Sequence, residues 1–125
     1  MKILIVEPMK SPRRADIPHS LGAMQQAVGG YIEAVYPFDD PVVLVCDEEG
    51  KLKDKPPNLY IPRKDIIVGT FFLCGQGEED FTDLPDELMD KYEKMFTKER
   101  MYFRTKMGIF PVLVYQDEDE KGGSV

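Results

Sequence analysis

Apolar residues occur along the chain in short runs that predict strands, separated by turns rich in glycine, proline and aspartate. The apolar runs at residues 3–6, 42–46 and 66–74 are typical of buried strands. Residues 31–38 alternate between two faces, which predicts another strand. Residues 109–115 predict a last strand at a sheet edge, because proline disfavours a central position. Together these runs indicate one mixed or antiparallel sheet of about five strands.

Two other segments have helical spacing. Residues 21–28 follow Ser20, a suitable N-cap, and precede two glycines that can end a helix in the left-handed conformation. Beyond residue 80 the apolar positions recur every three or four residues, which predicts a long C-terminal helix over residues 85–106. The predicted fold class is therefore α+β, with a short helix after the first strands and a long helix near the C-terminus.

Length and composition favour one domain. The 125 residues are 42% hydrophobic and 31% charged, as in an ordinary globular protein. Within this domain we expect a sheet and helix core over residues 1–80, the long helix within residues 81–107, and an acidic tail at 116–125. No signal peptide and no apolar run long enough to cross a bilayer is evident, so the expected location is the cytoplasm, without membrane contact.

The charge balance narrows the class of partner. The formal net charge is −7 and the isoelectric point is about 4.7. Proteins that bind nucleic acid neutralise phosphates with a basic face, so we expect no direct binding of nucleic acid. An acidic protein can instead associate with a partner protein that has a basic surface, because complementary charge accelerates their encounter. A homodimer is the alternative partnership.

The sequence contains no strong catalytic or metal motif. His19 is the only histidine, and Cys46 and Cys74 lie in apolar runs where buried thiols are the usual finding. Neither a disulfide between them nor a zinc site with His19 can be deduced from these spacings. We therefore expect no catalytic residue, no metal and no cofactor, and whether the protein is an enzyme stays open with a preference against it.

The stretch from Val28 to Pro41, "VGGYIEAVYPFDDP", joins the short helix to a strand and a turn. A phosphate-binding loop has its glycines before a helix, whereas these follow one, so they predict a helix C-cap. Glu33 lies in the middle of the predicted strand, and if its face is covered the carboxylate needs a partner such as an arginine. A salt bridge is the preferred interpretation of Glu33, and a ligand-binding carboxylate is the second.

The blocks "GGYIEAVYPFDDP", "DEEGKL" and "DIIVGTFF" give the chain a recognisable pattern. On these blocks the first 75 residues resemble a family of uncharacterised domain-of-unknown-function proteins carried by phages, plasmids and conjugative elements of Gram-positive bacteria. No reaction is established for that family. The resemblance implies a cytoplasmic accessory protein of a mobile element, and such proteins often act on host machinery, including defence systems.

Two sets of residues follow as candidate binding surfaces. The first matches the shared pattern: Tyr31, Glu33, Tyr36, Asp39 and Asp40. The second is a series of methionine and aromatic residues assigned to the long helix: Met89, Tyr92, Met95, Phe96, Tyr102 and Phe103. A series this wide predicts that some members are exposed for protein contact.

The leading hypothesis is a non-enzymatic protein that binds and modulates a host protein, for example as an anti-defence inhibitor. The alternative is a small-molecule or nucleotide-binding domain with a pocket near Tyr31, Glu33 and Tyr36. A third hypothesis is an enzyme that uses Glu33 with Asp39 and Asp40 as acid and base.

Overall fold

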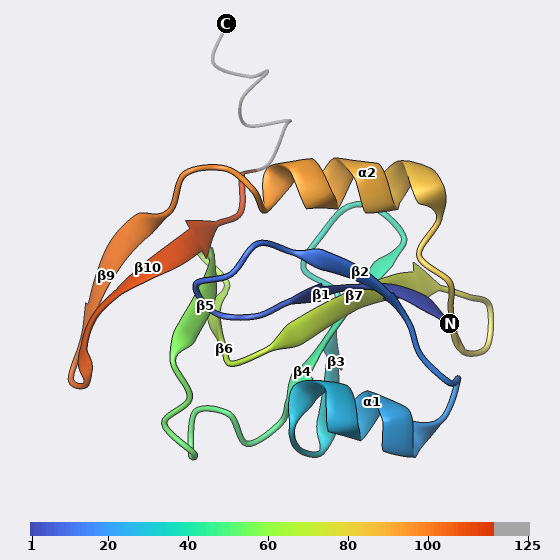
Figure 1. Ribbon diagram of the computed structural model, residues 1–125, viewed down its shortest axis with the longest axis horizontal. Helices are drawn as coiled ribbons and strands as arrows, with labels where there is room; N and C mark the ends of the chain where they lie inside the picture. The colour runs from blue at the N-terminus through green and yellow to red at the C-terminus, as the bar shows by residue number, and fades with distance from the viewer. Residues whose placement is uncertain (117–125) are drawn as a thin grey trace, which may run out of the picture.

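Two β-sheets and two short helices make up the part of the chain that the computed structural model describes, residues 1–116 (Figure 1). The predicted acidic tail therefore lies outside the described residues, except for Gln116. The first sheet contains six strands: β1 (Lys2–Val6), β2 (Arg13–Asp16), β3 (Ile32–Val35), β4 (Val42–Asp47), β7 (Phe71–Gln76) and β8 (Phe81–Thr82). The second sheet contains four: β5 (Pro57–Ile61), β6 (Asp65–Val68), β9 (Met101–Thr105) and β10 (Gly108–Val114).

The first sheet has the strand order β2-β1-β7-β4-β3, with β8 paired to the end of β7, and all its neighbours are antiparallel. The second sheet is mixed, with the order β6-β5-β10-β9 and a parallel pair between β5 and β10. The prediction of one sheet of about five strands is therefore wrong. Local patterns predicted individual strands, but the pairing of β5 with β10 joins segments about fifty residues apart and leaves no local signal.

The first helix forms as its caps indicate. Helix α1 spans Leu21–Val28, the hydroxyl of Ser20 accepts the hydrogen bond of the Ala23 N–H, and Gly29 adopts the left-handed conformation with φ 76°. Met24 and Val28 are the buried residues of this helix. Its place after the first two strands is the one that the sequence predicts.

The prediction of a long C-terminal helix is wrong. Helix α2 spans only Asp86–Met95, and the chain then turns into the hairpin of β9 and β10. At the end of α2 the Thr97 hydroxyl donates a hydrogen bond to the carbonyl oxygen of Lys94, an interaction that competes with helix continuation. The apolar positions of residues 101–105 fit both the spacing of a helix and the alternation of a strand. Their pairing with β10 overrides the local preference for a helix.

Strand β10 lies inside the second sheet although it contains Pro111, which predicted an edge strand. Pro111 pairs with Tyr102 of β9, whereas β5 pairs with β10 only at Leu113 and Val114. The proline therefore lies where β10 has one neighbour, and its missing N–H breaks no bond to β5.

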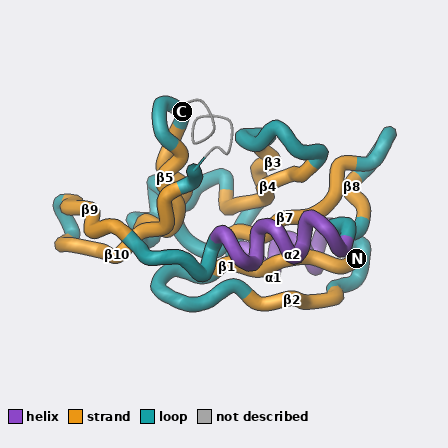
Figure 2. Tube along the Cα trace, turned by 90° about the horizontal axis from the view of Figure 1, so that it is seen from above, coloured by secondary structure: helices purple, strands orange, loops and turns teal. Residues whose placement is uncertain are grey.

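Two hydrophobic clusters cover opposite faces of the first sheet. Along β1, β4 and β7 successive side chains alternate between the clusters, which is why these strands are apolar throughout. The smaller cluster contains Met24 and Val28 of α1. The larger cluster lies among the first sheet, α2 and one face of the second sheet, and includes Leu59, Ile61 and Leu113. Figures 1 and 2 show α1 and α2 on opposite sides of the first sheet.

Asn58 joins the two sheets. Its buried side-chain amide donates hydrogen bonds of 2.9 Å to the carbonyl oxygens of Val6, at the end of β1, and Gly69. We expect Asn58→Ala to lower the free energy of unfolding by about 2 kcal/mol, because both carbonyl groups would lose a donor inside the protein. Chemical denaturation measures this change, with Lys64→Ala as control, because Lys64 is exposed and its ammonium donates a hydrogen bond to the Pro37 carbonyl. Equal losses in the two variants would contradict this role of Asn58.

Candidate functional site

The residues of the first predicted surface are spread along β3 and the turn that follows it. Tyr31 and Tyr36 are 65% and 56% exposed, and Glu33 is exposed on a strand at the edge of the first sheet. A cavity of about 390 Å³ beside Tyr31 is lined by Gln25, Gly30, Glu49 and Lys53, without Glu33 or Tyr36. The structure therefore does not gather Tyr31, Glu33 and Tyr36 around one cavity.

The guanidinium groups of Arg13 and Arg14 pair with carboxylates other than that of Glu33. The guanidinium of Arg13 bonds Glu7, and that of Arg14 bonds both Asp90 and Glu93 of α2. These bonds tie the β1–β2 region together and to α2, and the salt bridge of Glu33 stays a prediction.

The carboxylate of Asp40 is held by two side chains of α2. It accepts hydrogen bonds of 2.7 Å from the ammonium of Lys91 and the hydroxyl of Tyr92. The bond from Lys91, aided by that from Tyr92, lowers the pKa of Asp40 although partial burial opposes the shift. Asp39 lies instead in a separate cavity of about 190 Å³ that includes Arg63. The two adjacent aspartates therefore lie in different surroundings. Asp40 holds the β3–β4 turn against α2.

Gly30, the second glycine of the same stretch, adjoins the buried carboxylate of Asp47, whose burial the sequence did not indicate. The side chain of Asp47 is fully buried and bonds Lys53 Nζ at 2.8 Å, Lys55 Nζ at 2.6 Å and the Glu49 N–H at 2.9 Å. A Cβ on Gly30 would lie 2.5 Å from an Asp47 oxygen, so this position has room for glycine alone. The same lysines bond carbonyl groups at the end of α1, which closes the helix-to-strand junction.

The second predicted surface is divided between core and hairpin. Met89 and Tyr92 form the inward face of α2, Phe96 follows the helix as its C-cap, and all three are buried in the larger core cluster. Tyr102 and Phe103 lie on β9, where Tyr102 is 77% exposed. The assignment of all six residues to one interaction helix is therefore wrong, since the helix ends at Met95.

The two cysteines are buried on opposite faces of the first sheet, Cys46 in the larger cluster and Cys74 in the smaller one. Their side chains therefore point apart and cannot form a disulfide. Burial, with nearby carboxylates, raises the pKa of Cys46 to about 11 and that of Cys74 to about 12, so both stay protonated thiols. Among the described residues no group of three or more His, Cys, Asp or Glu side chains could hold a metal ion.

The second sheet has an apolar face that belongs to neither core cluster. Leu59, Ile67 and Leu113 point into the core, so the residues that alternate with them point to the other side. We call this other side the outer face. Its apolar residues are Tyr60 of β5, Ile66 and Val68 of β6, Met101 and Phe103 of β9, and Phe110, Val112 and Val114 of β10.

Most residues of the outer face are only half-buried, Met101 is 59% exposed, and Val112 is fully buried. The rings of Tyr60 and Phe103 pack against each other with centroids 5.1 Å apart, across the intervening strand β10. Apolar groups that face solvent in this way mark interaction surfaces in soluble proteins.

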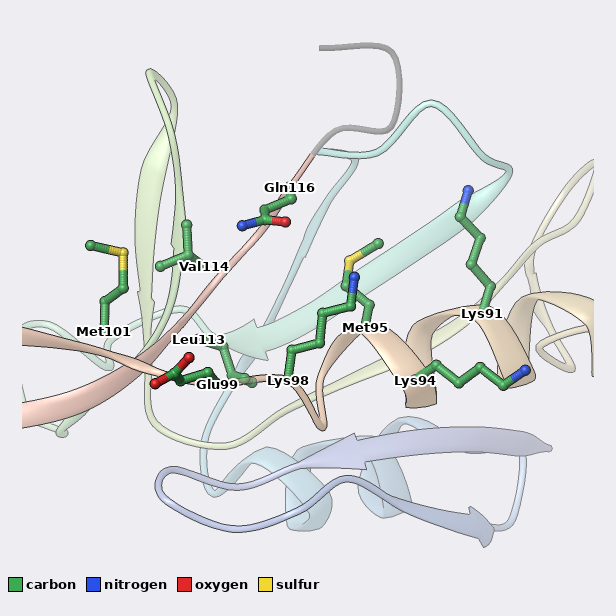
Figure 3. Close-up of a pocket in the computed structure, with 9 residues that line it drawn as sticks. All are labelled: Lys91, Lys94, Met95, Lys98, Glu99, Met101, Leu113, Val114 and Gln116. Carbon is green, nitrogen blue, oxygen red and sulfur yellow. The ribbon is translucent and has the colours of Figure 1, made fainter. Parts of the chain in front are cut away.

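A cavity of about 520 Å³ opens at one end of the outer face, where Met101 and Val114 meet the last turn of α2 (Figure 3). Met95 contributes a further apolar side chain, and Gln116 lies above the opening in the same view. Lys91, Lys94 and Lys98 line the α2 side of this cavity, together with Glu99. Lys98 extends upward beside Met95, whereas Lys94 runs along the helix away from Val114 (Figure 3).

A second cavity, of about 380 Å³, opens at the other end of the outer face. It is lined by Ile66, Val68 and Phe110 of the sheet, by Met107 at the tip of the β9–β10 hairpin, and by Met9. Met9 is a non-glycine residue with a positive φ of 64° and is 53% exposed. The outer face and its two cavities are the candidate functional site, and their residues fit apolar contact with another molecule.

This site was missed because its elements were assigned wrongly. Once residues 101–105 and 108–114 are aligned as a hairpin, apolar side chains fall on both of its faces. The available signal was the short segment Lys106 to Gly108 between two apolar and aromatic runs, which is typical of a hairpin turn.

No helix in the described part of the chain is long and apolar enough to span a membrane.

A family model described as Domain of unknown function (DUF3846) matches residues 1–97. The match extends past the 75 residues on which the sequence resemblance rests, through the end of α2, and stops before β9. The outer face thus combines strands inside the matched range, β5 and β6, with a hairpin beyond it. No curated protein and no solved structure matches the chain at a significant level.

Proposed function

We propose that this chain, which belongs to the family described as Domain of unknown function (DUF3846), is a non-enzymatic protein that binds and modulates a host protein. The resemblance of its first 75 residues to proteins of phages and plasmids supports an accessory role for a mobile element in the host cytosol. Inhibition of a host defence protein is the specific role that we propose.

The observation that carries the proposal is the apolar outer face with a cavity at each end. Protein interfaces have cores enriched in methionine and aromatic side chains and depleted in charge. The outer face has this composition: Met101 lines the first cavity, Phe110 lines the second, and the rings of Tyr60 and Phe103 pack together on the same face. We therefore propose the outer face as the contact surface, in place of the methionine and aromatic helix and the residues around β3 that the sequence suggested.

Charge supports a partner with a basic surface. Six carboxylate residues lie within ten positions around the β7–β8 turn and the start of α2: Glu78, Glu79, Asp80, Asp83, Asp86 and Glu87. In Figure 1 this turn and the β9–β10 hairpin lie at opposite ends of the longest axis. Carboxylates gathered at one end orient an approaching basic partner and make the association rate depend on salt.

A pull-down of the tagged chain from host lysate, washed at low and high salt, tests the proposal when it is run beside the variant Met101→Lys. We expect one host protein in near-stoichiometric amount with the wild type, less of it at high salt, and its loss with the variant. Retention of the same protein by the variant would reject the outer face as the contact surface. Absence of any host protein at both salt concentrations would reject the function.

The cavity in Figure 3 favours a second candidate function, binding of a small anionic molecule. Its volume of about 520 Å³ lies within the range of small-molecule sites, and lysines adjoin its apolar residues. A ligand that binds only the folded state raises the melting temperature. A thermal-shift screen of nucleotides and other anionic metabolites would therefore show a stabilising compound whose effect is lost in Lys98→Ala. A screen without any shift would reject this candidate.

A further inference from the structure

We propose that two copies of this chain pair through the open edge of β9 and form a symmetric dimer. β9 is the last strand in the order of the second sheet, and Figure 2 shows the β9–β10 hairpin at the outside of the molecule. The pairing would join two second sheets into one continuous sheet of eight strands. This inference is independent of the proposed function, because it concerns the purified protein alone.

Four other strands, β2, β3, β6 and the two-residue β8, have a single neighbour in the described chain, and each of them is shorter than β9. β2, with the sequence RRAD, carries three charged side chains, and β3 and β6 have four residues each and include Glu33 and Asp65. β9 has five residues, MYFRT, with no proline and a single charged side chain, Arg104. Short length, charge and proline are the features that keep edge strands from pairing, and β9 has the fewest of them.

The hairpin geometry identifies the main-chain groups at the open edge. Lys106 and Met107 form a two-residue turn between the paired residues Thr105 and Gly108. The pair that closes such a turn exchanges both hydrogen bonds, and hydrogen-bonded pairs then alternate along the hairpin. Thr105 and every second residue before it therefore direct their N–H and C=O groups toward β10. Tyr102 and Arg104 direct theirs to the open side.

Pro111 agrees with this assignment. It is the partner of Tyr102 in the β9–β10 register, so its ring nitrogen points away from β9 and its lack of a donor breaks no hairpin bond. The open edge of β9 thus presents two N–H and two C=O groups, from Tyr102 and Arg104, in the spacing that an antiparallel strand requires.

An antiparallel copy of β9 complements this edge when Phe103 lies opposite the partner's Phe103. Tyr102 then lies opposite the partner's Arg104, and Arg104 opposite the partner's Tyr102, so that all four outward groups of each strand are bonded. The same register brings a guanidinium beside a tyrosine ring twice, which is a favourable cation–π arrangement. On the outer face Met101 lies opposite the partner's Thr105, so this face continues across the two-fold axis.

Other registers are less favourable. A symmetric pairing centred on Phe103 uses all five residues of β9, whereas one centred on Tyr102 or Arg104 pairs three. Centring on Arg104 also places two guanidinium groups opposite each other, which is destabilising. In the favoured register Arg100 and Lys106 follow outside β9, and each is held within its own copy, by the Lys10 carbonyl at 2.6 Å and by Asp54 at 3.8 Å.

Sedimentation equilibrium over a range of concentrations tests the dimer directly. We expect the wild type to change from monomer to dimer as its concentration rises, and Arg104→Pro to bind itself at least about tenfold more weakly. Proline is tolerated at an edge position whose N–H points outward, so the variant keeps its hairpin. Arg104→Thr is the matched control. It retains the backbone N–H, so its self-association should stay closer to that of the wild type. A wild type that is monomeric at every concentration would overturn the proposal, and so would equal effects of the two variants.

Cysteine crosslinking tests the register without relying on the proline variant. Phe103→Cys places two thiols at directly opposed positions, at a separation that a disulfide can span. Ile109→Cys is the control, since Ile109 is 60% exposed on the same hairpin but lies one strand away from the edge. We expect a disulfide-linked dimer from the first variant and none from the second. Equal crosslinking in both variants, or crosslinking in neither, would overturn this register.

Discussion

Replacing Asp47 by alanine is expected to lower the free energy of unfolding by about 3 kcal/mol, the largest stability effect of any polar substitution that we predict. The carboxylate is buried and is the common acceptor of Lys53, Lys55 and the Glu49 N–H. Its removal leaves the more buried ammonium, that of Lys55, without its carboxylate partner. The lysines are partly exposed, so the cost falls at the lower end of the range for buried pairs.

The acid dependence of stability provides an independent measure of the same carboxylate. Burial alone would raise the pKa of Asp47, but hydrogen bonds from Lys53 and Lys55 outweigh it and hold the pKa at about 2. Because this folded-state pKa is below the unfolded value of about 4, the contribution is complete above pH 4 and is lost as the pH falls toward 2. The difference between the wild type and Asp47→Ala should therefore shrink over that interval.

Denaturation curves of Asp47→Ala and Asp65→Ala at several pH values provide the comparison. Asp65 pairs with Lys51 at the surface, where both side chains are about half exposed, so its loss should cost less than about 1 kcal/mol. Similar effects of the two substitutions at neutral pH would show that Asp47 does not hold the junction between α1 and β3.

Introducing a charge on the outer face is expected to have the largest effect on partner binding. Met101 is 59% exposed, so Met101→Lys should leave the fold intact while it adds a charge to the apolar end of the first cavity. We expect affinity for the host partner to fall at least about thirtyfold, which corresponds to about 2 kcal/mol, the loss that marks an interface hot spot. Titration calorimetry with the partner recovered from lysate measures this change.

Leu21→Lys is the matched control for that substitution. Leu21 is 56% exposed at the start of α1, far along the chain from the outer face, so the same charge there should leave affinity within about threefold of the wild type. Equal losses in Met101→Lys and Leu21→Lys would indicate a general effect of charge and would contradict a contact at Met101.

Local signals predicted the parts of the fold that depend on neighbouring residues. Ser20 and Gly29 mark the ends of α1 through bonds within a few positions, and the runs at β1, β4 and β7 are apolar because both of their faces are covered. The pairing of Leu59 with Leu113 depends on residues far apart in the sequence, so the sequence could not reveal the second sheet. Met101 to Thr105 fit a helix or a strand, and only pairing with β10 decides between them.

Prediction of the candidate site depended on the same choice between helix and strand for residues 101–105. Asp40 and Tyr92 were both predicted as binding residues, whereas they satisfy each other in the structure, at a distance of 2.7 Å between a carboxylate and a buried hydroxyl. A buried tyrosine needs a hydrogen-bond partner, but sequence does not show which carboxylate supplies it. Met101 and Phe103 contribute to the outer face only because β9 exists, so an expected helix concealed the surface.

Site-specific photocrosslinking in host cells tests the central claim, that the outer face contacts a partner protein. A photoreactive phenylalanine analogue at position 101 reports on the outer face. The same group at position 36 reports on the turn directly after β3, where Tyr36 has a similar exposure of 56%. The account predicts one covalent adduct with a host protein from position 101 and none from position 36. An adduct from position 36 alone would contradict the account and would return the binding surface to β3.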